Sequence, residues 1–321
     1  DFYSTSSKRG LINYCNFTEN KAGTSGGALN WNGEYSNLTN CIFTGNTAES
    51  SGAIDALNPN GRISNCTFVG NTADSYGSIY WTGDKALIEK CDFINGSADL
   101  SGGAFCIAAE YVTVDNCNFI NTSSNQHSGA ICMAEGENTV INSNFINCSA
   151  WIGGAIYAHG DFNENKKYII ENCQFINCHA KAEGGALGLS HNNMDVKNCV
   201  FINNTATKGA GIMVGGINYP KAIHGNNTHG HNITIDNCTF RNNNATEEGG
   251  AVHISGDNNT FLNSKFYFNE APEGGAVHIT GDNAAAIGSI FDDNFAHGGK
   301  GAAIYVKGDY GSLNHSIFTN H

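Results

Sequence analysis

The chain has 321 residues, and its 16 lysines and arginines against 29 aspartates and glutamates give a formal net charge of −13. This acidity argues against a nucleic-acid partner and against an anionic membrane surface, since both attract basic proteins. Forty glycines beside three prolines exclude collagen and proline-rich linkers, and no apolar run is long enough to span a membrane.

A short phrase recurs along the chain and sets its period. It consists of Cys or Ser, any residue, then Phe, and its twelve phenylalanines are Phe17, Phe43, Phe68, Phe93, Phe119, Phe145, Phe175, Phe201, Phe240, Phe266, Phe291 and Phe318. Successive copies lie 25 to 27 residues apart, except for spacings of 30 and 39 that mark two insertions. A fixed period over a whole chain indicates a solenoid of stacked units.

We therefore expect one continuous domain over residues 1–321, with loop insertions near 160–168 and 215–232. No secretion signal precedes the first copy, and the last copy stops part-way through. We expect the sequence to be a fragment of a longer surface protein.

Each unit begins with an apolar residue three positions before the Cys or Ser, as Ile63 stands before Cys66. Inward positions of one strand lie two apart, so a spacing of three requires one extra residue that turns the chain. That residue is usually an asparagine: Asn40, Asn65, Asn116, Asn142, Asn172, Asn198, Asn237 and Asn263. Asparagine tolerates a left-handed backbone better than most non-glycine residues, so we predict a corner between two short strands.

A second turn follows the phenylalanine and leads to a glycine phrase such as Gly249-Gly250-Ala251-Val252. Glycine permits positive φ and close backbone approach, and the apolar residue after it starts a third strand. Three short strands and three corners in about 25 residues fit one coil of a parallel β-helix, with coils ~4.8 Å apart. We predict an all-β, single-domain, right-handed parallel β-helix of about 12 coils, the hand following the usual crossover rule. The phenylalanines should stack inside it.

Two phrases carry a family resemblance: Gly249-Gly250-Ala251-Val252 and Phe240-Arg241-Asn242-Asn243, which recur together along nearly the whole chain. In these phrases the chain resembles the repeats of chlamydial polymorphic membrane proteins and of adhesin-like surface proteins of methanogenic archaea. The resemblance implies an extracellular, cell-surface β-helix engaged in adhesion, and it supplies no catalytic residue. The chain departs from the pattern where other residues replace the last asparagine of Phe-x-x-Asn, at Gly96, Thr122, Cys148, Cys178 and His321.

Two sets of carboxylates recur at equal positions in successive coils. They are Glu49, Asp74 and Asp99, six residues after the phenylalanine, and Asp257, Asp282 and Asp309, at the end of the glycine strand. Stacked like charges repel, which would favour a bound Ca²⁺. The alternative is that each aspartate caps a turn and directs its charge into water. No other cofactor is indicated.

Eight of the twelve cysteines occupy the column that serine also fills, so we expect them to be free and buried. The other four form two pairs, each one coil apart. Cys106 and Cys132 should point outward, and Cys148 and Cys178 replace the asparagine of Phe-x-x-Asn. Both pairs are disulfide candidates, because adjacent coils bring them into register and an exported protein can meet oxidant.

Histidines supply the remaining candidates. His253 and His278 should be outward neighbours, but two ligands make a poor metal site, so we expect a solvated pair. The longer insertion holds four candidates for a binding loop: Tyr219, His224, His229 and His231. Long loops on rigid scaffolds commonly carry recognition residues, although a solvated loop without a role is the alternative.

Three functions fit these patterns. The first is an extracellular adhesin-like rod that displays loops to a glycan or protein on another cell. The second is a polysaccharide lyase or glycosidase, which would need a cation beside a basic residue or paired carboxylates across a groove. The third is a stalk or filament in which neighbouring repeats of the same protein stack. Since no catalytic constellation converges in the sequence, we expect the first function and no enzyme.

Overall fold

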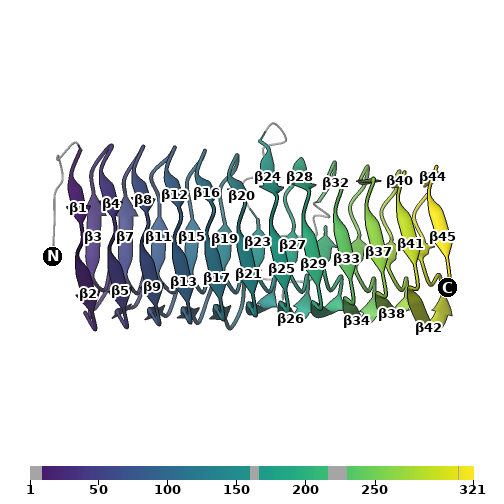
Figure 1. Ribbon diagram of the computed structural model, residues 1–321, viewed down its shortest axis with the longest axis horizontal. Coiled ribbons are helices and arrows are strands. Elements are labelled where there is room, and N and C mark those ends of the chain that lie inside the picture. The colour runs from purple at the N-terminus through teal and green to yellow at the C-terminus, as the bar shows by residue number, and fades with distance from the viewer. Residues whose placement is uncertain (1–8, 160–165, 216–229, 310) are drawn as a thin grey trace.

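The computed structural model describes residues 9–159, 166–215, 230–309 and 311–321. Every regular element within these ranges is a β-strand, and none of their segments is a helix able to cross a membrane. The strands pair in parallel and coil into a rod (Figure 1). Four sheets run along the rod, named A to D here in the order in which each coil visits them.

Sheet A holds β1 (Leu11–Asn13), β4 (Asn37–Thr39), β8 (Arg62–Ser64), β12 (Leu87–Glu89), β16 (Thr113–Asp115), β20 (Thr139–Ile141), β24 (Tyr168–Glu171), β28 (Met194–Lys197), β32 (Thr234–Asp236), β36 (Thr260–Leu262), β40 (Ala285–Ile287) and β44 (Ser312–Asn314). Sheet B holds β2 (Asn16–Thr18), β5 (Ile42–Thr44), β9 (Thr67–Val69), β13 (Asp92–Ile94), β17 (Asn118–Ile120), β21 (Asn144–Ile146), β25 (Gln174–Ile176), β29 (Val200–Ile202), β33 (Thr239–Arg241), β37 (Lys265–Tyr267), β41 (Ile290–Asp292) and β45 (Ile317–Thr319).

Sheet C holds β6 (Thr47–Ala48), β10 (Thr72–Ala73), β14 (Ser97–Ala98), β18 (Ser123–Ser124), β22 (Ser149–Ile152), β26 (His179–Glu183), β30 (Thr205–Lys208), β34 (Asn244–Glu248), β38 (Glu270–Glu273) and β42 (Phe295–Lys300). Sheet D holds β3 (Leu29–Asn32), β7 (Ile54–Leu57), β11 (Ile79–Trp81), β15 (Phe105–Ile107), β19 (Ile131–Met133), β23 (Ile156–Ala158), β27 (Leu187–Leu189), β31 (Ile212–Val214), β35 (Val252–Ile254), β39 (Val277–Ile279) and β43 (Ile304–Val306).

The coil differs from the expected one in a single respect, because it contains four strands. The additional strand lies in sheet C, between the phenylalanine strand and the glycine phrase. In the first coils it is only two residues long, as in β6 and β10. So short a segment of threonine and alanine has no alternation from which a strand can be recognised.

The phenylalanine stack is confirmed. Neighbouring rings in sheet B lie 4.6 to 5.0 Å apart and within 10° of parallel along all twelve positions. The apolar column of sheet A is equally regular, since Leu38 pairs with Ile63 and Ile63 with Ile88. Phenylalanine therefore fills the sheet B side of every coil, and apolar side chains of varying type fill the sheet A side.

The expected corner asparagine adopts the left-handed conformation that the pattern requires. The eight asparagines before the Cys or Ser have φ between +50° and +54°. The last asparagine of Phe-x-x-Asn is buried instead, and it bonds the coils together. Asn243, for example, donates from its backbone N and its Nδ2 to Asn269 Oδ1, at 3.1 and 2.9 Å, and its Nδ2 also donates to the Phe201 carbonyl.

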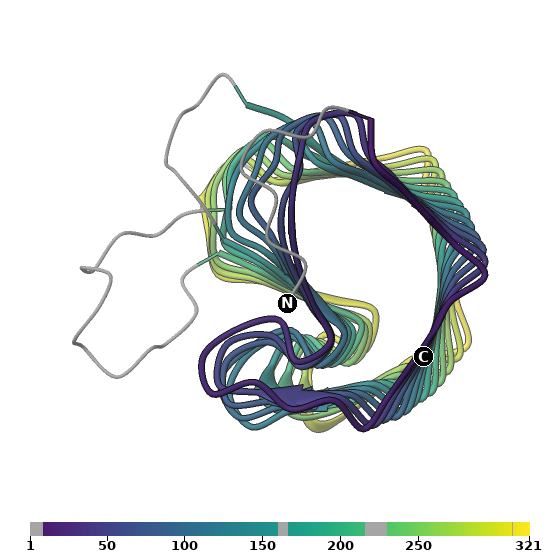
Figure 2. The same cartoon turned by 90° about the vertical axis from the view of Figure 1, so that its left-hand side faces the viewer.

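Sheets A, B and D surround one hydrophobic core that runs the length of the rod, whereas sheet C has a separate small cluster of alanines. Seen along the rod, each coil is a large loop with a smaller curl beside it (Figure 2). Residues at the end of sheet C contact the outward side chains of sheet D. The Tyr76 ring stacks on Tyr80 at 4.6 Å, and Glu248 Oε2 lies 3.3 Å from His253 Nδ1. Polar, aromatic and ionisable side chains meet at this junction of sheets C and D.

Candidate functional site

The junction of sheets C and D depends on the two glycines of the glycine phrase. Gly249 has φ of +66°, a region that strains other residues. A Cβ on Gly250 would lie 2.0 Å from the Gly275 carbonyl oxygen, so only glycine allows the next coil to pack there. The turn folds the end of sheet C back over sheet D, which places Glu248 above His253.

The middle residue of each sheet D strand points away from the core. Val252 and Ile254 belong to the core cluster, whereas His253 between them does not. In register along the rod, these middle residues are Asn30, Asp55, Tyr80, Cys106, Cys132, Tyr157, Gly188, Met213, His253, His278 and Tyr305. We call this set the outer column. Its chemistry changes from coil to coil while the inward phenylalanines stay the same.

A second column stands opposite, formed by the residue at the sheet C side of each glycine turn. In the first half of the rod it contains Ser51, Tyr76, Ser101, His127 and Ile152. In the second half it contains Glu183, Lys208, Glu248, Glu273 and Lys300, in register on neighbouring strands. We call these five residues the charged column. Each lysine is the register neighbour of at least one glutamate, close enough for the two charges to pair, whereas Glu248 and Glu273 carry like charges on neighbouring strands.

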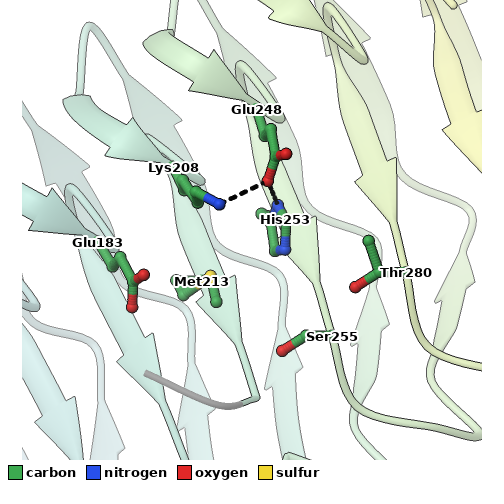
Figure 3. A pocket seen from close by; sticks show the side chains of 7 residues that line it. All are labelled: Glu183, Lys208, Met213, Glu248, His253, Ser255 and Thr280. Carbon is green, nitrogen blue, oxygen red and sulfur yellow. Dashed lines mark ion pairs between the residues drawn. The ribbon is translucent and has the colours of Figure 1, made fainter. Parts of the chain in front are cut away.

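A cavity of about 260 Å³ lies between the charged column and the outer column. Its lining consists of Glu183, Lys208, Met213, Glu248, His253, Ser255 and Thr280. Figure 3 shows the side chains of Lys208 and Glu248 reaching from sheet C toward His253, with Ser255 and Thr280 at the other end. The cavity thus offers acids, a base, an imidazole and hydroxyls to a ligand.

Ion pairs hold the charged column in place. Lys208 Nζ lies 2.9 Å from Glu248 Oε2, and Lys300 Nζ lies 2.6 Å from Glu273 Oε1. Burial raises the pKa of Glu248, but the hydrogen bond from Lys208 and the neighbouring positive charges together outweigh burial and bring that pKa below its usual value. Hydrogen bonds from Lys300 and Lys307 lower the pKa of Glu273 to about 2. Both carboxylates are therefore ionised at neutral pH.

The two histidines are buried, contrary to the expected solvated pair. Sheet C covers them, and this strand was absent from the expected coil. Their Nδ1 atoms lie 3.1 Å apart, and both face Glu248 Oε2, at 3.3 Å for His253 and 3.6 Å for His278. Burial lowers the pKa of His253 to about 3 and that of His278 to about 4. Both rings are neutral at pH 7 and keep a lone pair for a ligand.

The first half of the rod carries a different buried group in the outer column. Cys106 and Cys132 are register partners that point away from the core, as expected, but sheet C buries them. Cys132 Sγ lies 3.3 Å from His159 Nε2. The hydrogen bond from the Cys106 thiol lowers the pKa of Cys132, and the same interaction raises the pKa of Cys106.

All twelve cysteines are free thiols in the structure. Seven of the eight cysteines of the interior column are buried, and Cys15 at the end of the rod is partly exposed. Cys148 and Cys178 are also buried, and oxidation of either candidate pair stays a prediction. Cys148 shows how a thiol replaces the ladder asparagine, because its Sγ donates to the Phe119 carbonyl oxygen and accepts from the Thr122 hydroxyl.

The aspartates that end the glycine strand connect successive coils. Asp257 Oδ1 accepts from the backbone N of Asp282 at 2.8 Å, and Asp282 Oδ1 accepts from that of Asp309 at 2.7 Å. These bonds resemble the turn-capping alternative, except that each carboxylate caps the next coil rather than its own. Ca²⁺ at this column stays a prediction.

The other carboxylate set, Glu49, Asp74 and Asp99, is exposed at the end of sheet C strands. Asp99 accepts a hydrogen bond from Asn125 Nδ2 at 2.8 Å. Within the described residues, one group of three side chains can hold a metal ion, and it contains neither acidic set. That group is Glu248, His253 and His278.

Three of the four binding-loop candidates, Tyr219, His224 and His229, lie outside the described residues. His231 lies inside them, where its Nδ1 accepts from the backbone N of Asp257 at 2.8 Å. Its own backbone N donates to Asn192 Oδ1 at 2.9 Å. His231 therefore connects the end of the insertion to two coils.

Comparison with known protein families identifies the architecture. The family model described as "Right handed beta helix region" matches residues 52–228, which is more than half of the chain. The chain belongs to this right-handed β-helix family. The match confirms the predicted fold and its hand. A second model, the repeat of the chlamydial polymorphic membrane proteins, matches residues 237–255 of this β-helix, a segment that includes Glu248, His253 and Ser255.

Two solved structures are similar to the chain. One is the tailspike protein of the Escherichia coli bacteriophage HK620 in complex with a hexasaccharide, at 13% identity and a TM-score of 0.48, covering 89% of this chain and 60% of the tailspike chain. The other is a mannuronic acid specific polysaccharide family 6 lyase from human gut microbiota, at 13% identity and a TM-score of 0.42, covering 96% of this chain and 80% of the lyase. No curated protein sequence matches the sequence of this chain.

Sequence reasoning missed the charged column and hence the cavity. A signal was present, because each of its members stands directly before a glycine, as in Glu183-Gly184-Gly185, Lys208-Gly209 and Glu273-Gly274-Gly275. The repeat of a charge at one position in five successive units of the β-helix marks one side of the rod. Without the turn geometry, however, nothing in the sequence indicates that these charges face His253.

Proposed function

We propose that the chain is an extracellular, cell-surface adhesin-like rod that binds a glycan or protein of another cell along the junction of sheets C and D. The supporting observation is the contrast between constant and varied columns. The phenylalanine column repeats one residue type at twelve positions, whereas the outer column carries seven residue types at eleven. A scaffold that keeps an apolar interior with one invariant column and varies the chemistry of one outer face suits display and binding.

The location of the charged residues favours the second half of the rod as the binding region. The cavity of about 260 Å³ lies there, and the repeat that resembles those of chlamydial polymorphic membrane proteins contributes three of its lining residues. A concave site with a few placed polar groups is the usual form of a ligand site. We propose that the binding site includes this cavity.

Binding without chemical change is part of the proposal. The Glu248 carboxylate oxygens both have basic neighbours, with Oε2 2.9 Å from Lys208 and Oε1 3.9 Å from Lys307. A general acid needs a raised pKa and a general base needs an unengaged carboxylate. Glu248 meets neither condition, and the same holds for Glu273 with its two lysines.

An array of microbial and plant cell-wall glycans and surface proteins tests this function, probed with the purified chain with and without Ca²⁺. Two readouts are needed: retention of the chain, and release of shortened sugars. We expect retention on a defined class without release. Release of shortened sugars would overturn the proposal in favour of an enzyme, and the absence of any retention would favour a stalk.

A further inference from the structure

Three potential ligand atoms converge at the end of the cavity. Glu248 Oε2 lies 3.3 Å from His253 Nδ1 and 3.6 Å from His278 Nδ1, and the two nitrogens are 3.1 Å apart. A tetrahedral Zn²⁺ ion with bonds of about 2.0–2.1 Å holds its ligand atoms about 3.3–3.4 Å from one another. The observed separations of 3.1, 3.3 and 3.6 Å lie close to that value. An ion therefore fits between the three ligand atoms without movement of the strands.

Hydrogen bonds alone do not satisfy every buried polar atom of this group. A neutral imidazole has one N–H group and one nitrogen lone pair. The two rings direct their Nδ1 atoms at each other and at the same carboxylate oxygen, while His278 Nε2 is buried without a hydrogen-bond partner. Whichever nitrogen of His278 carries the proton, one buried polar group of that ring stays unsatisfied. A cation at the convergence point would accept all three lone pairs at once.

We propose that Glu248, His253 and His278 form a binding site for one divalent transition-metal ion, with Zn²⁺ the best match. Two imidazole nitrogens and one carboxylate oxygen are a donor set that Zn²⁺ accepts, and three protein ligands leave a fourth position open. Because Glu248 and His253 also line the cavity, that position is available to a water molecule or a ligand there.

Glu273 supplies an outer partner for the same site. Its Oε2 lies 3.9 Å from His278 Nε2, the nitrogen that has no hydrogen bond. Metal binding at Nδ1 places the ring proton on Nε2, and histidine ligands commonly donate this proton to a carboxylate. With that proton on Nε2, the one buried atom of His278 that lacks a hydrogen bond would face a carboxylate oxygen.

Lys208 opposes the ion, and this opposition gives a distinctive test. Its Nζ lies 2.9 Å from Glu248 Oε2, the same oxygen that would bind the metal. Glu183 pairs with Lys208 in the strand register and lines the same cavity, so it offers the ammonium group a second carboxylate. Removal of the Lys208 charge should therefore strengthen metal binding, an effect that a purely structural change would not produce.

The proposal does not depend on what the rod binds, and the whole chain is used to test it. The chain, stripped with EDTA and kept reduced, is titrated with Zn²⁺ by calorimetry near neutral pH. We expect one tight site per chain. Glu248→Gln should weaken it at least about tenfold, whereas Glu247→Gln, an exposed acid of the same strand, should leave it unchanged. Lys208→Gln should tighten it.

Two further measurements decide where an ion lies. Co²⁺ in a tetrahedral site absorbs visible light strongly, and this band should appear in the unaltered chain and disappear in His253→Gln. Replacement of His224, His229 and His231 together by glutamine should leave both signals in place. Three results would each overturn the proposal. They are an equal Zn²⁺ affinity in the two glutamate variants, a loss of binding only in the triple histidine variant, and the absence of any stoichiometric binding.

Discussion

The imidazole rings of His253 and His278 lie one coil apart with their Nδ1 atoms 3.1 Å from each other, buried where sheet C folds over sheet D. Each ring is neutral because burial lowers the pKa of His253 to about 3 and that of His278 to about 4. The charged and titratable groups around the pair are Glu248, Glu273, Lys208, Lys307 and Tyr305.

This burial predicts that the metal-free chain loses stability as the pH falls below about 6.5. Unfolded histidines gain a proton at that pH, whereas the folded pair stays neutral until about pH 3 to 4, so protons favour the unfolded state. The stabilisation is fully present well above pH ~6.5 and falls by on the order of 4 kcal/mol, about 2 kcal/mol for each histidine, by pH ~5.

Urea unfolding in chelator at pH 7 and pH 5 measures this change. The lower limit of pH 5 keeps the carboxylates ionised, so the histidines dominate the difference. His278→Phe should reduce the pH dependence by about half, while His297→Gln, an exposed histidine paired with Glu270, should leave it unaltered. An identical pH dependence in His278→Phe and the unaltered chain would contradict the assignment.

The phenylalanine stack should contribute most where it is buried on both sides. Phe145 is fully buried between Phe119 at 4.6 Å and Phe175 at 4.8 Å. Phe145→Ala should lower the free energy of unfolding by about 3–5 kcal/mol, because it leaves a large cavity. Phe318→Ala at the end of the rod, where the ring is 41% exposed, should cost less than about 1.5 kcal/mol. Denaturant titration followed by circular dichroism measures both, and equal losses would refute a rod held by this stack.

The left-handed backbone of the asparagine corners predicts which substitutions there destabilise the chain most. Asn116 has φ of +53°, which glycine adopts freely and a β-branched residue does not. Asn116→Val should destabilise the chain by about 1–2 kcal/mol, and Asn116→Gly should change its stability by less than about 1 kcal/mol. The midpoint of thermal unfolding ranks the two variants. A valine variant as stable as the glycine variant would show that the corner does not need this conformation.

The buried asparagine ladder should be sensitive to loss of a single amide. Asn269 Oδ1 accepts from the backbone and side-chain nitrogens of Asn243, and its Nδ2 donates to the Phe240 carbonyl at 3.1 Å. Asn269→Ala leaves these buried groups unpaired and should cost about 2–4 kcal/mol. Asn244→Ala, at an exposed asparagine of strand β34, is the control and should cost less than about 1 kcal/mol. Hydrogen exchange of the Asn243 backbone amide gives an independent readout, since it should become faster only in the first variant.

The pair Cys106 and Cys132 should differ from the interior column in its reaction with oxidant. Cys106 and Cys132 lie outside the main core, and the hydrogen bond from Cys106 lowers the pKa of Cys132, which favours the reactive thiolate. Mild oxidation should link this pair before it modifies Cys173 or Cys199, whose pKa values burial raises. Peptide mapping under non-reducing conditions identifies the linked residues. Earlier oxidation of the interior column would contradict the expected order.

The parts of the fold that repeat could be predicted from the sequence, and the parts that depend on one turn could not. Phe43 and Phe68 share a role because the same phrase surrounds both, so twelve copies define the inward side of sheet B. The positive φ of Asn65 follows equally from its place before Cys66. Repetition thus identifies the inside of the rod.

The candidate site escaped prediction for a physical reason. Glu248 and His253 are only five residues apart, yet their contact depends on how Gly249 and Gly250 fold sheet C over sheet D. A strand as short as β6 has no periodicity to reveal that sheet. His253 was therefore expected in solvent, although it is buried. Side chains that vary from coil to coil carry no repeat signal, and these are the ones that form the cavity.

We expect the junction of sheets C and D to be the binding face, and this expectation can be tested directly. Its test compares two Thr→Trp variants on the glycan or protein that the array retains. Thr280 is exposed at the wall of the cavity, whereas Thr260 lies in sheet A at the start of the same coil. We predict that Thr280→Trp weakens binding at least about tenfold by filling the cavity, and that Thr260→Trp leaves the affinity unchanged. Unchanged binding in Thr280→Trp, or an equal loss in both variants, would place the partner elsewhere and contradict the account.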